Sequence, residues 1–534
     1  MLIAYRRDVT TTREQTIRAG SPSGTGWRPL VAAAGVGDAP PGVADAAARG
    51  PAIAAIAHLS DFHICDAESP ARLVHLHRHG LPGSPYRRAL GGDVGAYRPQ
   101  EILTAQVAVA MVATINQLGA GPLTGRALDA AVLTGDLTDN AQSNEADWFR
   151  RIIDGGALTA ASGDPDPAGS EWVGSPAAPH DPTFWHPHPS AAGDLWRERW
   201  GFPVVDGLLM AARRAIVSPG LAIPVLPVPG NHDLLLEGTA VPDAAARALA
   251  EGALRPTDLP PGHTPLALLG ITSQVGPSRY LVDGSPTVPV TADVRRRIVG
   301  PDEFREYHAE TAAAERRFGP RHSYTAPITT GPDAVRLIVL DTVNEHGGWQ
   351  GSIGADQLSW LRATIAAAPE PYLVVATHHP SWTLINGYTP PGDPSAAPRV
   401  LADELLGVLL GEPRVVAWLA GHVHHHSVTQ HRGDGDRVLP EITSAALLDW
   451  PQQSRTLEIV RPGDGTLRLV STAIDHVAPL AYDGSALDDP LHLAALSRQL
   501  SRNVPRFADL FDPLDATGAR VELNTTITIP DPHR

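Results

Sequence analysis

Short hydrophobic runs recur along this chain, and each one ends directly before a polar motif. Runs of this length without regular polar alternation predict strands that are buried on both faces. They occupy residues 53–60, 130–134, 223–228, 336–340, 372–376 and 415–419. Pro224 and Pro227 lie within the third run. They favour an edge strand or a bulge there, because proline cannot donate a hydrogen bond to a neighbouring strand.

Helical periodicity separates several of these predicted strands, most clearly over residues 101–118 and 355–368. Strands that alternate with helices predict an α/β fold whose functional residues follow the carboxyl ends of the strands. The last part of the chain is β-rich. Two alternating segments flank the hairpin signal Pro462–Gly465, and a helix over 491–502 and a strand over 521–529 are expected after them.

The polar motifs extend from residue 61 to residue 424 and must meet in one site, so we predict one large catalytic domain over residues 51–450. Residues 1–50 are predicted to be an irregular lead-in, and residues 451–534 a β-rich C-terminal extension packed on that domain. Residues 155–205 and 234–330 are long insertions, the first rich in tryptophan. Either insertion could form a lid or a substrate wall, or be decoration without ligand contact.

The formal net charge of −16 changes the range of expected partners. A strongly acidic chain is a poor binder of duplex nucleic acid, which requires Lys and Arg to neutralise phosphates. A small phosphorylated substrate stays possible, because bound metal ions dominate the local field at such a site. No feature of the sequence indicates a particular oligomeric state.

We predict no targeting signal from the sequence. Arg6 and Arg7 are followed by polar residues, so no signal peptide is predicted. No apolar run reaches the length of a membrane span, which leads us to expect a cytoplasmic protein without a membrane span. Cys65 is the single cysteine, so no intramolecular disulfide is possible.

Five polar motifs carry the candidate chemistry. They are Asp61-Phe62-His63, Gly135-Asp136, Gly230-Asn231-His232-Asp233, Thr377-His378-His379-Pro380 and Gly421-His422-Val423-His424. In a strand, residues i and i+2 point to the same face. Asp61 with His63, and His422 with His424, are therefore each expected to reach a metal from adjacent pleats. The motifs supply three carboxylate or amide oxygens and four imidazoles. This number of ligands suits two metal ions, each bound by both nitrogen and oxygen, and Mn, Fe and Zn are all suitable.

These ligands indicate attack of a metal-bound hydroxide on phosphorus, with Asp136 shared by the two metals. The leaving oxygen then needs a proton. His232 is the candidate general acid, and Asp233 or another carboxylate is expected to hold its ring. Four arginines follow the first motif, and each could reach a substrate phosphate or be a solvated or structural residue: Arg72, Arg87, Arg88 and Arg98.

The ordered motifs resemble the calcineurin-like metallophosphoesterase superfamily over roughly residues 53–450. The resemblance implies a four-layer αββα sandwich and two metal sites. One site would take Asp61, His63, Asp136 and His424, and the other Asp136, Asn231, His378 and His422. It also implies His232 as the catalytic histidine. Asn140 could support the ligands from outside, and His379 is a supporting residue or an alternative ligand to His378.

The finer resemblance is to the cyclic-nucleotide phosphodiesterase and purple-acid-phosphatase branch, within an actinobacterial-type subfamily. Asp139 stands where purple acid phosphatases have their iron-binding tyrosine, so their colour is not expected. The predicted function is hydrolysis of phosphomonoester or phosphodiester bonds by a dinuclear metal centre. The alternatives are a cyclic-nucleotide phosphodiesterase, a nuclease, and a nucleotide-binding module whose site is blocked.

Overall fold

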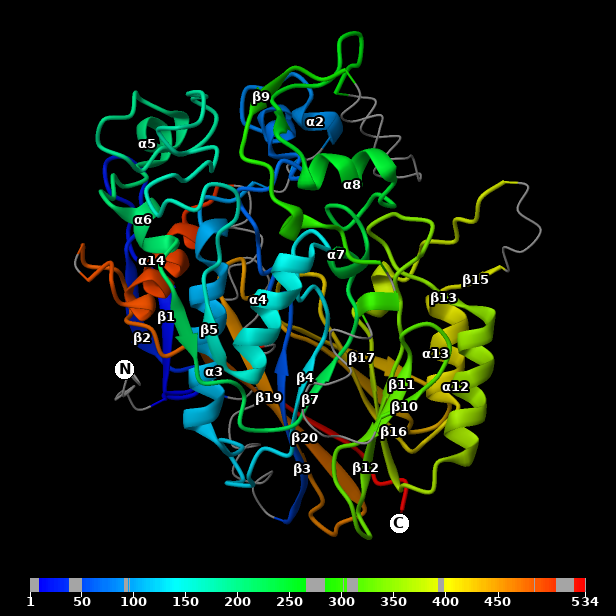
Figure 1. Ribbon diagram of the computed structural model, residues 1–534. Coiled ribbons are helices and arrows are strands. Elements are labelled where there is room, and N and C mark those ends of the chain that lie inside the picture. The colour runs from blue at the N-terminus through cyan, green and yellow to red at the C-terminus, as the bar shows by residue number, and fades with distance from the viewer. Residues whose placement is uncertain are drawn as a thin grey trace.

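Two β-sheets that pack face to face form the centre of the protein (Figure 1). The computed structural model describes residues 9–37, 50–90, 95, 97–265, 284–300, 302–304, 316–391, 398–484, 486–505 and 523–533. One sheet has the order β21-β20-β19-β3-β4-β7, and the other β10-β11-β12-β14-β16-β18-β17. Between them lies an apolar layer that includes Ile56 and Val132 from the first sheet and Val374 and Leu419 from the second.

The strands of the first sheet are β3 (Ala52–Leu59), β4 (Ala130–Leu133), β7 (Val225–Pro227), β19 (Gln453–Val460), β20 (Thr466–Asp475) and β21 (Asn524–Pro530). Those of the second are β10 (Arg317–Phe318), β11 (Tyr324–Pro327), β12 (Val335–Val339), β14 (Tyr372–Ala376), β16 (Val415–Ala420), β17 (Ser427–Arg432) and β18 (Val438–Thr443). Each of the six hydrophobic runs of the sequence is one of these strands. The proline-containing run is the edge strand β7, as expected.

Helices cover the outer face of each sheet. The helices α3 (Thr104–Leu118), α4 (Ser143–Asp154) and α14 (Pro490–Arg502) lie on the first sheet, and α12 (Ala355–Ala367) and α13 (Ala402–Leu410) on the second (Figure 1). The predicted helices over 101–118, 355–368 and 491–502 are therefore confirmed. Helix, sheet, sheet and helix make the four-layer α/β sandwich expected from the sequence.

The C-terminal strands complete the first sheet. Strand β19 pairs with β3 on one side and with β20 on the other, and β20 pairs with β21. The hairpin predicted around residues 462–465 is the β19–β20 connection. Three of the six strands of this sheet therefore come from beyond residue 450. The domain limits at residues 51–450 and 451–534 stay a prediction.

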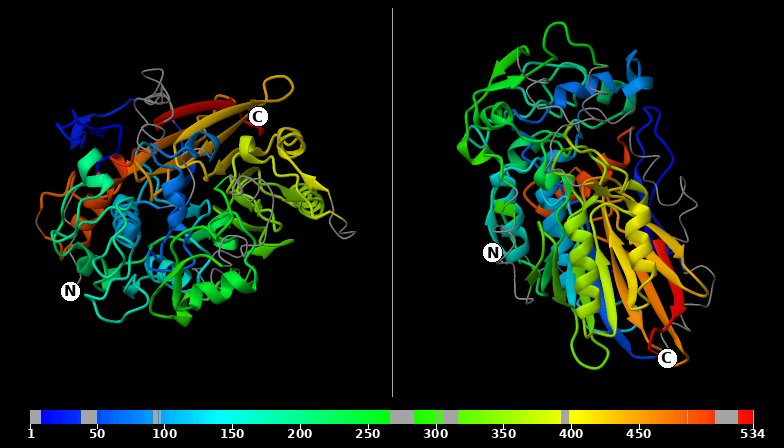
Figure 2. Two further views of the ribbon diagram at one scale, coloured as in Figure 1. Left: turned by 90° about the horizontal axis from the view of Figure 1, so that it is seen from above. Right: turned by 90° about the vertical axis from the view of Figure 1, so that its right-hand side faces the viewer.

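Most of the two insertions lies beyond the carboxyl ends of the central strands, at the top of Figure 1 and of the right-hand view in Figure 2. They contain α5 (Leu195–Trp200), α8 (Ala244–Glu251), β8 (Leu254–Pro256) and β9 (Thr287–Pro289), and α6 (Leu208–Ala212) follows the first of them. The end of the second insertion returns to the second sheet as β10 and β11. Trp172, Trp185 and Trp196 are buried in one aromatic core. The first insertion is therefore a packed structure, because these large rings remove their apolar surface from water.

The remaining short elements lie in the connections and, for an antiparallel pair of strands, in the segment before β3. They are β1 (Gln15–Ala19), β2 (Leu30–Ala34), η1 (Val74–His79), α2 (Arg87–Leu90), η2 (Glu101–Leu103), β5 (Gly156–Leu158), β6 (Ile216–Ser218), α7 (Asn231–Leu234), η3 (Val294–Arg296), β13 (Ile353–Gly354), η4 (Ser381–Thr383) and β15 (Arg399–Val400). Within the described residues, the stretch Glu101–Leu118 is long and apolar enough to cross a membrane, and 78% of it is buried inside the protein, as in a core helix.

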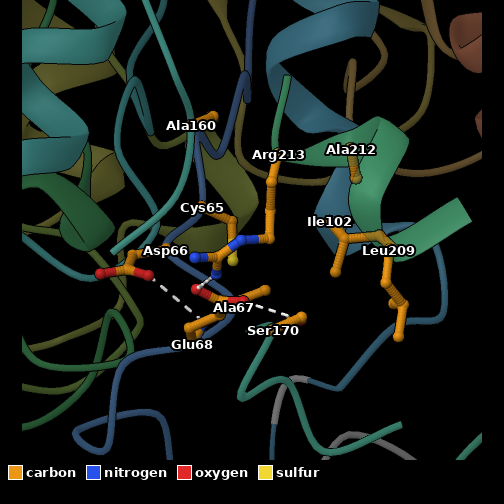
Figure 3. A pocket seen from close by; sticks show the side chains of 10 residues that line it. All are labelled: Cys65, Asp66, Ala67, Glu68, Ile102, Ala160, Ser170, Leu209, Ala212 and Arg213. Atoms are coloured by element: carbon orange, nitrogen blue, oxygen red, sulfur yellow. Dashed lines mark hydrogen bonds and ion pairs between the residues drawn. The ribbon is translucent and has the colours of Figure 1, made fainter. Parts of the chain in front are cut away.

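Glu68, in the segment that follows His63, bonds to both insertions and forms a buried ion pair with Arg213, which lies between them. Arg213 binds the carboxylate of Glu68, which also accepts a hydrogen bond from Ser170 Oγ at 2.8 Å (Figure 3). Arg255 donates to the Glu68 carbonyl at 2.7 Å. The cavity beside this pair measures about 20 Å³, room for about one water molecule. It is too small for a substrate, so the contact is structural.

Replacing Arg213 with alanine is expected to lower the free energy of unfolding by about 3–5 kcal/mol, because Glu68 is left buried and uncompensated. Urea titration followed by circular dichroism measures the loss. The matched control is Arg151→Ala, which breaks an exposed pair with Asp147 and is expected to cost less than about 1 kcal/mol. Equal losses in the two variants would contradict a structural role for the buried pair.

Candidate metal centre

Loops at the carboxyl ends of five strands bring the predicted ligands together. Asp61 and His63 follow β3, Asp136 follows β4, and Asn231 begins α7 after β7. In the facing sheet, His378 follows β14, and His422 and His424 follow β16. Because β3, β4 and β7 are parallel, and β12, β14, β16 and β18 are parallel, each sheet presents its ligand-bearing ends at one edge.

The backbone at five of these seven ligands is left-handed. The φ angles are 51° at Asp61, 44° at His63, 49° at Asp136, 70° at His422 and 58° at His424. This corrects the expectation that the i, i+2 pairs reach the metal from adjacent pleats of a strand: both pairs lie in loops after the strand has ended. Non-glycine residues avoid this region, and such strain concentrates at functional sites where the surrounding structure holds it in place.

The first group of ligands consists of Asp61, His63, Asp136 and His424. One ligand atom from each lies within 4.8 Å of the others, and all four side chains are buried. His63 Nε2 is 3.2 Å from His424 Nε2 and 3.6 Å from Asp136 Oδ2. Asp61 Oδ1 is 3.4 Å from His424 Nε2. These atoms form the four-ligand set that the resemblance implies for one metal.

The second group forms around His378. Its Nε2 atom is 2.9 Å from Asn231 Oδ1, 3.2 Å from His422 Nδ1 and 3.2 Å from Asp136 Oδ2. The Asn231 amide donates from Nδ2 to the carbonyl of Gly238 at 2.9 Å, which directs its oxygen towards the histidines. Asp136 Oδ2 thus lies between the two groups, where a shared ligand is required.

The ring orientations fit metal binding. The Nδ1 atoms of three histidines are bonded on the outer side: His63 to Asp139 Oδ1 at 3.0 Å, His378 to the carbonyl oxygen of Thr134 at 2.7 Å, and His424 to Asp449 Oδ2 at 2.7 Å. Such partners fix the tautomer and leave Nε2 for a cation. A set of imidazole nitrogens with carboxylate and amide oxygens suits Mn, Fe or Zn.

The charges around the site favour positive charge within it. Burial disfavours the imidazolium of His378, yet the Asp136 carboxylate raises its pKa to about 9. Burial also lowers the pKa of His424, but hydrogen bonds and charge from Asp449 and Asp61 outweigh it and raise the pKa to about 10. Carboxylates that hold protons this firmly on neighbouring imidazoles would be neutralised equally well by divalent cations.

The two carboxylates behind the histidines are each held by a buried arginine. Arg72 binds Asp139, and Arg98 Nε donates to Asp449 Oδ1 at 2.7 Å. Both arginines also reach Glu101 Oε2, Arg72 from Nη2 at 3.0 Å and Arg98 from its backbone N–H at 2.9 Å. Glu101 therefore joins the supports of two metal-facing histidines.

This network decides between the two alternatives left open for Arg72 and Arg98, and it explains part of the first insertion. Arg72 and Arg98 are buried in ion pairs and do not provide a binding site for substrate phosphate. Trp172 of the insertion donates from Nε1 to Glu101 Oε1 at 2.8 Å. The insertion thus braces the network that supports the ligands. The sequence motifs gave no signal for Asp449 or Glu101.

Replacing Asp449 with asparagine is expected to weaken metal binding by about 10–100-fold, because His424 loses the charged partner that orients its ring. Titration of the metal-depleted protein with Zn²⁺ or Mn²⁺ in a calorimeter measures the change. Asp531→Asn is the matched control, since Asp531 is another buried carboxylate with an arginine partner, Arg461. Unchanged affinity in the Asp449 variant would refute this supporting role.

His232 lies beside the first group, and its ring is in edge contact with that of His63 at a centroid distance of 4.6 Å. Its Nδ1–H donates to the backbone carbonyl of Asp139 at 2.6 Å, so Nε2 is the atom left for substrate. Gly238 packs closely here: a Cβ atom at that position would lie 2.4 Å from His232 Nε2. A side chain at Gly238 would therefore displace the candidate acid.

Asp233 is not positioned as the sequence led us to expect. Its Oδ1 accepts hydrogen bonds from the backbone of Leu137 and Thr138 at 2.9 Å, and its Oδ2 accepts from Gly230 N at 2.8 Å. It thus braces the loop that carries Asp136, and the ring of His232 is held by a carbonyl instead. Burial and the nearby Asp136 charge raise the pKa of Asp233 to about 7.

His379 and Asn140 support neighbouring segments. A nitrogen of His379 comes within 4.8 Å of one from His378 and one from His422. However, its Nε2–H donates to the carbonyl of Trp349 at 3.0 Å and its Nδ1 accepts from Thr342 Oγ1 at 2.8 Å. Neither ring nitrogen is left for a metal. Asn140 Oδ1 accepts from the backbone N–H of Glu237 at 2.7 Å.

Comparison with known proteins agrees with this geometry in part. The sequence model of the calcineurin-like phosphoesterase family matches residues 191–426, a segment that includes Asn231, His378, His422 and His424. No curated protein has a matching sequence.

Among solved structures, the chain is similar to a dimetal phosphatase from Danio rerio, with 13% identity over 80% of this chain and 97% of that one and a TM-score of 0.34. It is also similar to the purple acid phosphatase PPD1 from yellow lupin (Lupinus luteus) seeds, with 10% identity over 79% of this chain and 52% of that one and a TM-score of 0.29.

Proposed function

We propose that the chain is a calcineurin-like phosphoesterase that hydrolyses phosphomonoester or phosphodiester bonds with the aid of two metal ions. The observation that carries the proposal is the position of Asp136 Oδ2. It lies 3.6 Å from His63 Nε2 and 3.2 Å from His378 Nε2, each the centre of one ligand group. One carboxylate shared between two ligand groups would hold two metals close together, as two-metal hydrolysis requires. The family match over residues 191–426 supports the same assignment.

The bound metals would supply an activated water and would neutralise charge on the phosphoryl oxygens. Asp61, His63 and His424 would hold one metal, Asn231, His378 and His422 the other, and Asp136 both. His232 would donate a proton from Nε2 to the leaving oxygen, while the Asp139 carbonyl keeps its ring in place. Asp139, which stands where a tyrosine would be expected in a purple acid phosphatase, orients His63 from behind.

The substrate we propose is a small phosphorylated molecule. The net charge of −16 disfavours duplex nucleic acid. Asp139 and the His378-His379-Pro380 segment are the features that favour the phosphodiesterase branch over the purple phosphatases, and a cyclic-nucleotide substrate is the finer form of this proposal.

A substrate screen against a panel of metals tests the function. Purified protein depleted of metal is loaded with Mn²⁺, Fe²⁺ or Zn²⁺ and assayed with aryl phosphates, bis-aryl phosphates, cyclic nucleotides and single-stranded DNA. We expect metal-dependent turnover of at least one small ester. Turnover of DNA alone would identify a nuclease. Nucleotide binding without turnover of any substrate would refute the proposal in favour of a binding module.

A further inference from the structure

The indole of Trp349 lies on a histidine of the metal centre. The rings of Trp349 and His422 are stacked, with centroids 5.8 Å apart and an interplanar angle of 21°. His422 Nδ1 is in turn 3.2 Å from His378 Nε2. Trp349 nevertheless keeps 39% of its surface exposed. A single imidazole ring therefore separates an accessible aromatic surface from the atoms that face the metal.

Hydrogen bonds on several sides hold the loop that carries this ring. Gly348 N donates to the carbonyl of Thr239 at 2.8 Å, and the carbonyl of Trp349 accepts from His379 at 3.0 Å. Gly351 N donates to the carbonyl of Thr383 at 3.0 Å, and Asn386 Nδ2 to that of Gly347 at 2.8 Å. The loop is thus ordered, although the large side chain at its centre is only partly used in packing.

The neighbouring segment extends the apolar surface. Trp382 and Ile385 are each 57% exposed, and they belong to the segment that is bonded to the Trp349 loop through Thr383 and Asn386. Single exposed hydrophobic residues are ordinary, whereas several on two joined loops beside a polar site are typical of a ligand-binding surface.

We propose that Trp349 is the stacking platform for a planar group of the substrate, so that the enzyme acts on phosphoesters with an aryl or heteroaryl group. This inference rests on the proposed function of the metal centre. Indole rings stack on flat aromatic groups with little dependence on their substituents. An ester whose phosphate is held by the metal centre would bring its aromatic group towards the exposed part of Trp349, whereas an alkyl group would gain little from this contact.

A purely positioning role for Trp349 makes a different prediction. The backbone N–H of His422 already donates to the Asp61 carboxylate at 3.0 Å, and its ring also contacts that of His379 at a centroid distance of 4.4 Å. His422 therefore has supports besides the indole. Loss of a positioning contact would weaken every ligand equally, whereas loss of a platform removes the preference for aromatic ligands.

Calorimetric titration of the metal-loaded protein with phenylphosphonate and ethylphosphonate distinguishes the two roles. We expect the wild-type protein to bind phenylphosphonate about tenfold more tightly, a ratio in the range that aromatic stacking provides. Trp349→Ala should reduce the ratio to about one, and Trp349→Phe should retain most of it. Phe318→Ala, which removes an exposed ring on β10, is the control and should leave the ratio unchanged.

Equal affinities of the wild-type protein for the two phosphonates, or absence of binding, would overturn the inference. It would also be overturned if Trp349→Ala weakened both phosphonates equally or lowered the metal content, because the ring would then only orient His422. These readouts need no turnover. Failure of every ester in the substrate screen would therefore refute the proposed function by a separate measurement.

Discussion

Replacement of Asp136 by alanine is expected to lower kcat/KM by about a thousandfold or more. The carboxylate is the ligand shared by both groups, so its loss affects both metal positions at once. Charge stabilisation by metal ions contributes several kcal/mol to phosphoryl transfer, and about 4 kcal/mol corresponds to a thousandfold in rate. The same side chain accepts a hydrogen bond from His232 N at 2.8 Å, so the candidate acid would shift as well.

Asp136→Asn separates these contributions. Asparagine has the same size and can still accept the hydrogen bond from His232, but it carries no charge to share between two cations. Steady-state kinetics and metal content by mass spectrometry should therefore show nearly the same loss as in the alanine variant. Retention of two metals per chain together with activity within tenfold of the wild type would rule out a bridging role for Asp136.

The strands that position these ligands were predictable from the sequence because they are buried on both faces. Parallel strands buried on both faces must be almost wholly apolar, so runs such as residues 372–376 stand out, and the first polar residue after each run is at the functional edge. The register between distant strands is not contained in a local pattern. That β19 lies beside β3, about 400 residues away along the chain, is decided by packing and hydrogen bonding across the sheet.

The residues that hold the ligands in place could not be predicted from the sequence for the same reason. Asp449 is 25 residues from His424, and Arg98 is 351 residues from Asp449. No motif spacing relates such residues, and an aspartate before a tryptophan has no distinctive pattern. Trp349 is similarly isolated in a glycine-containing loop. What the motifs predicted is the identity of the ligands; the left-handed turns that aim them and the charges that hold them follow from tertiary structure.

His232 is expected to matter most when the leaving group is poor. A weakly acidic alkoxide cannot depart without a proton, whereas p-nitrophenolate can, and a positioned general acid typically contributes about 10²–10⁴-fold. His232→Ala should therefore lower kcat by about that factor for alkyl phosphates and by much less for p-nitrophenyl phosphate. The dependence of log kcat on leaving-group pKa should become steeper than in the wild type. Because the ring is held by the Asp139 carbonyl and not by Asp233, Asp233→Asn should leave that slope unchanged even if it lowers stability. An equal loss for both substrates in the His232 variant would show that the imidazole binds the phosphate without donating a proton.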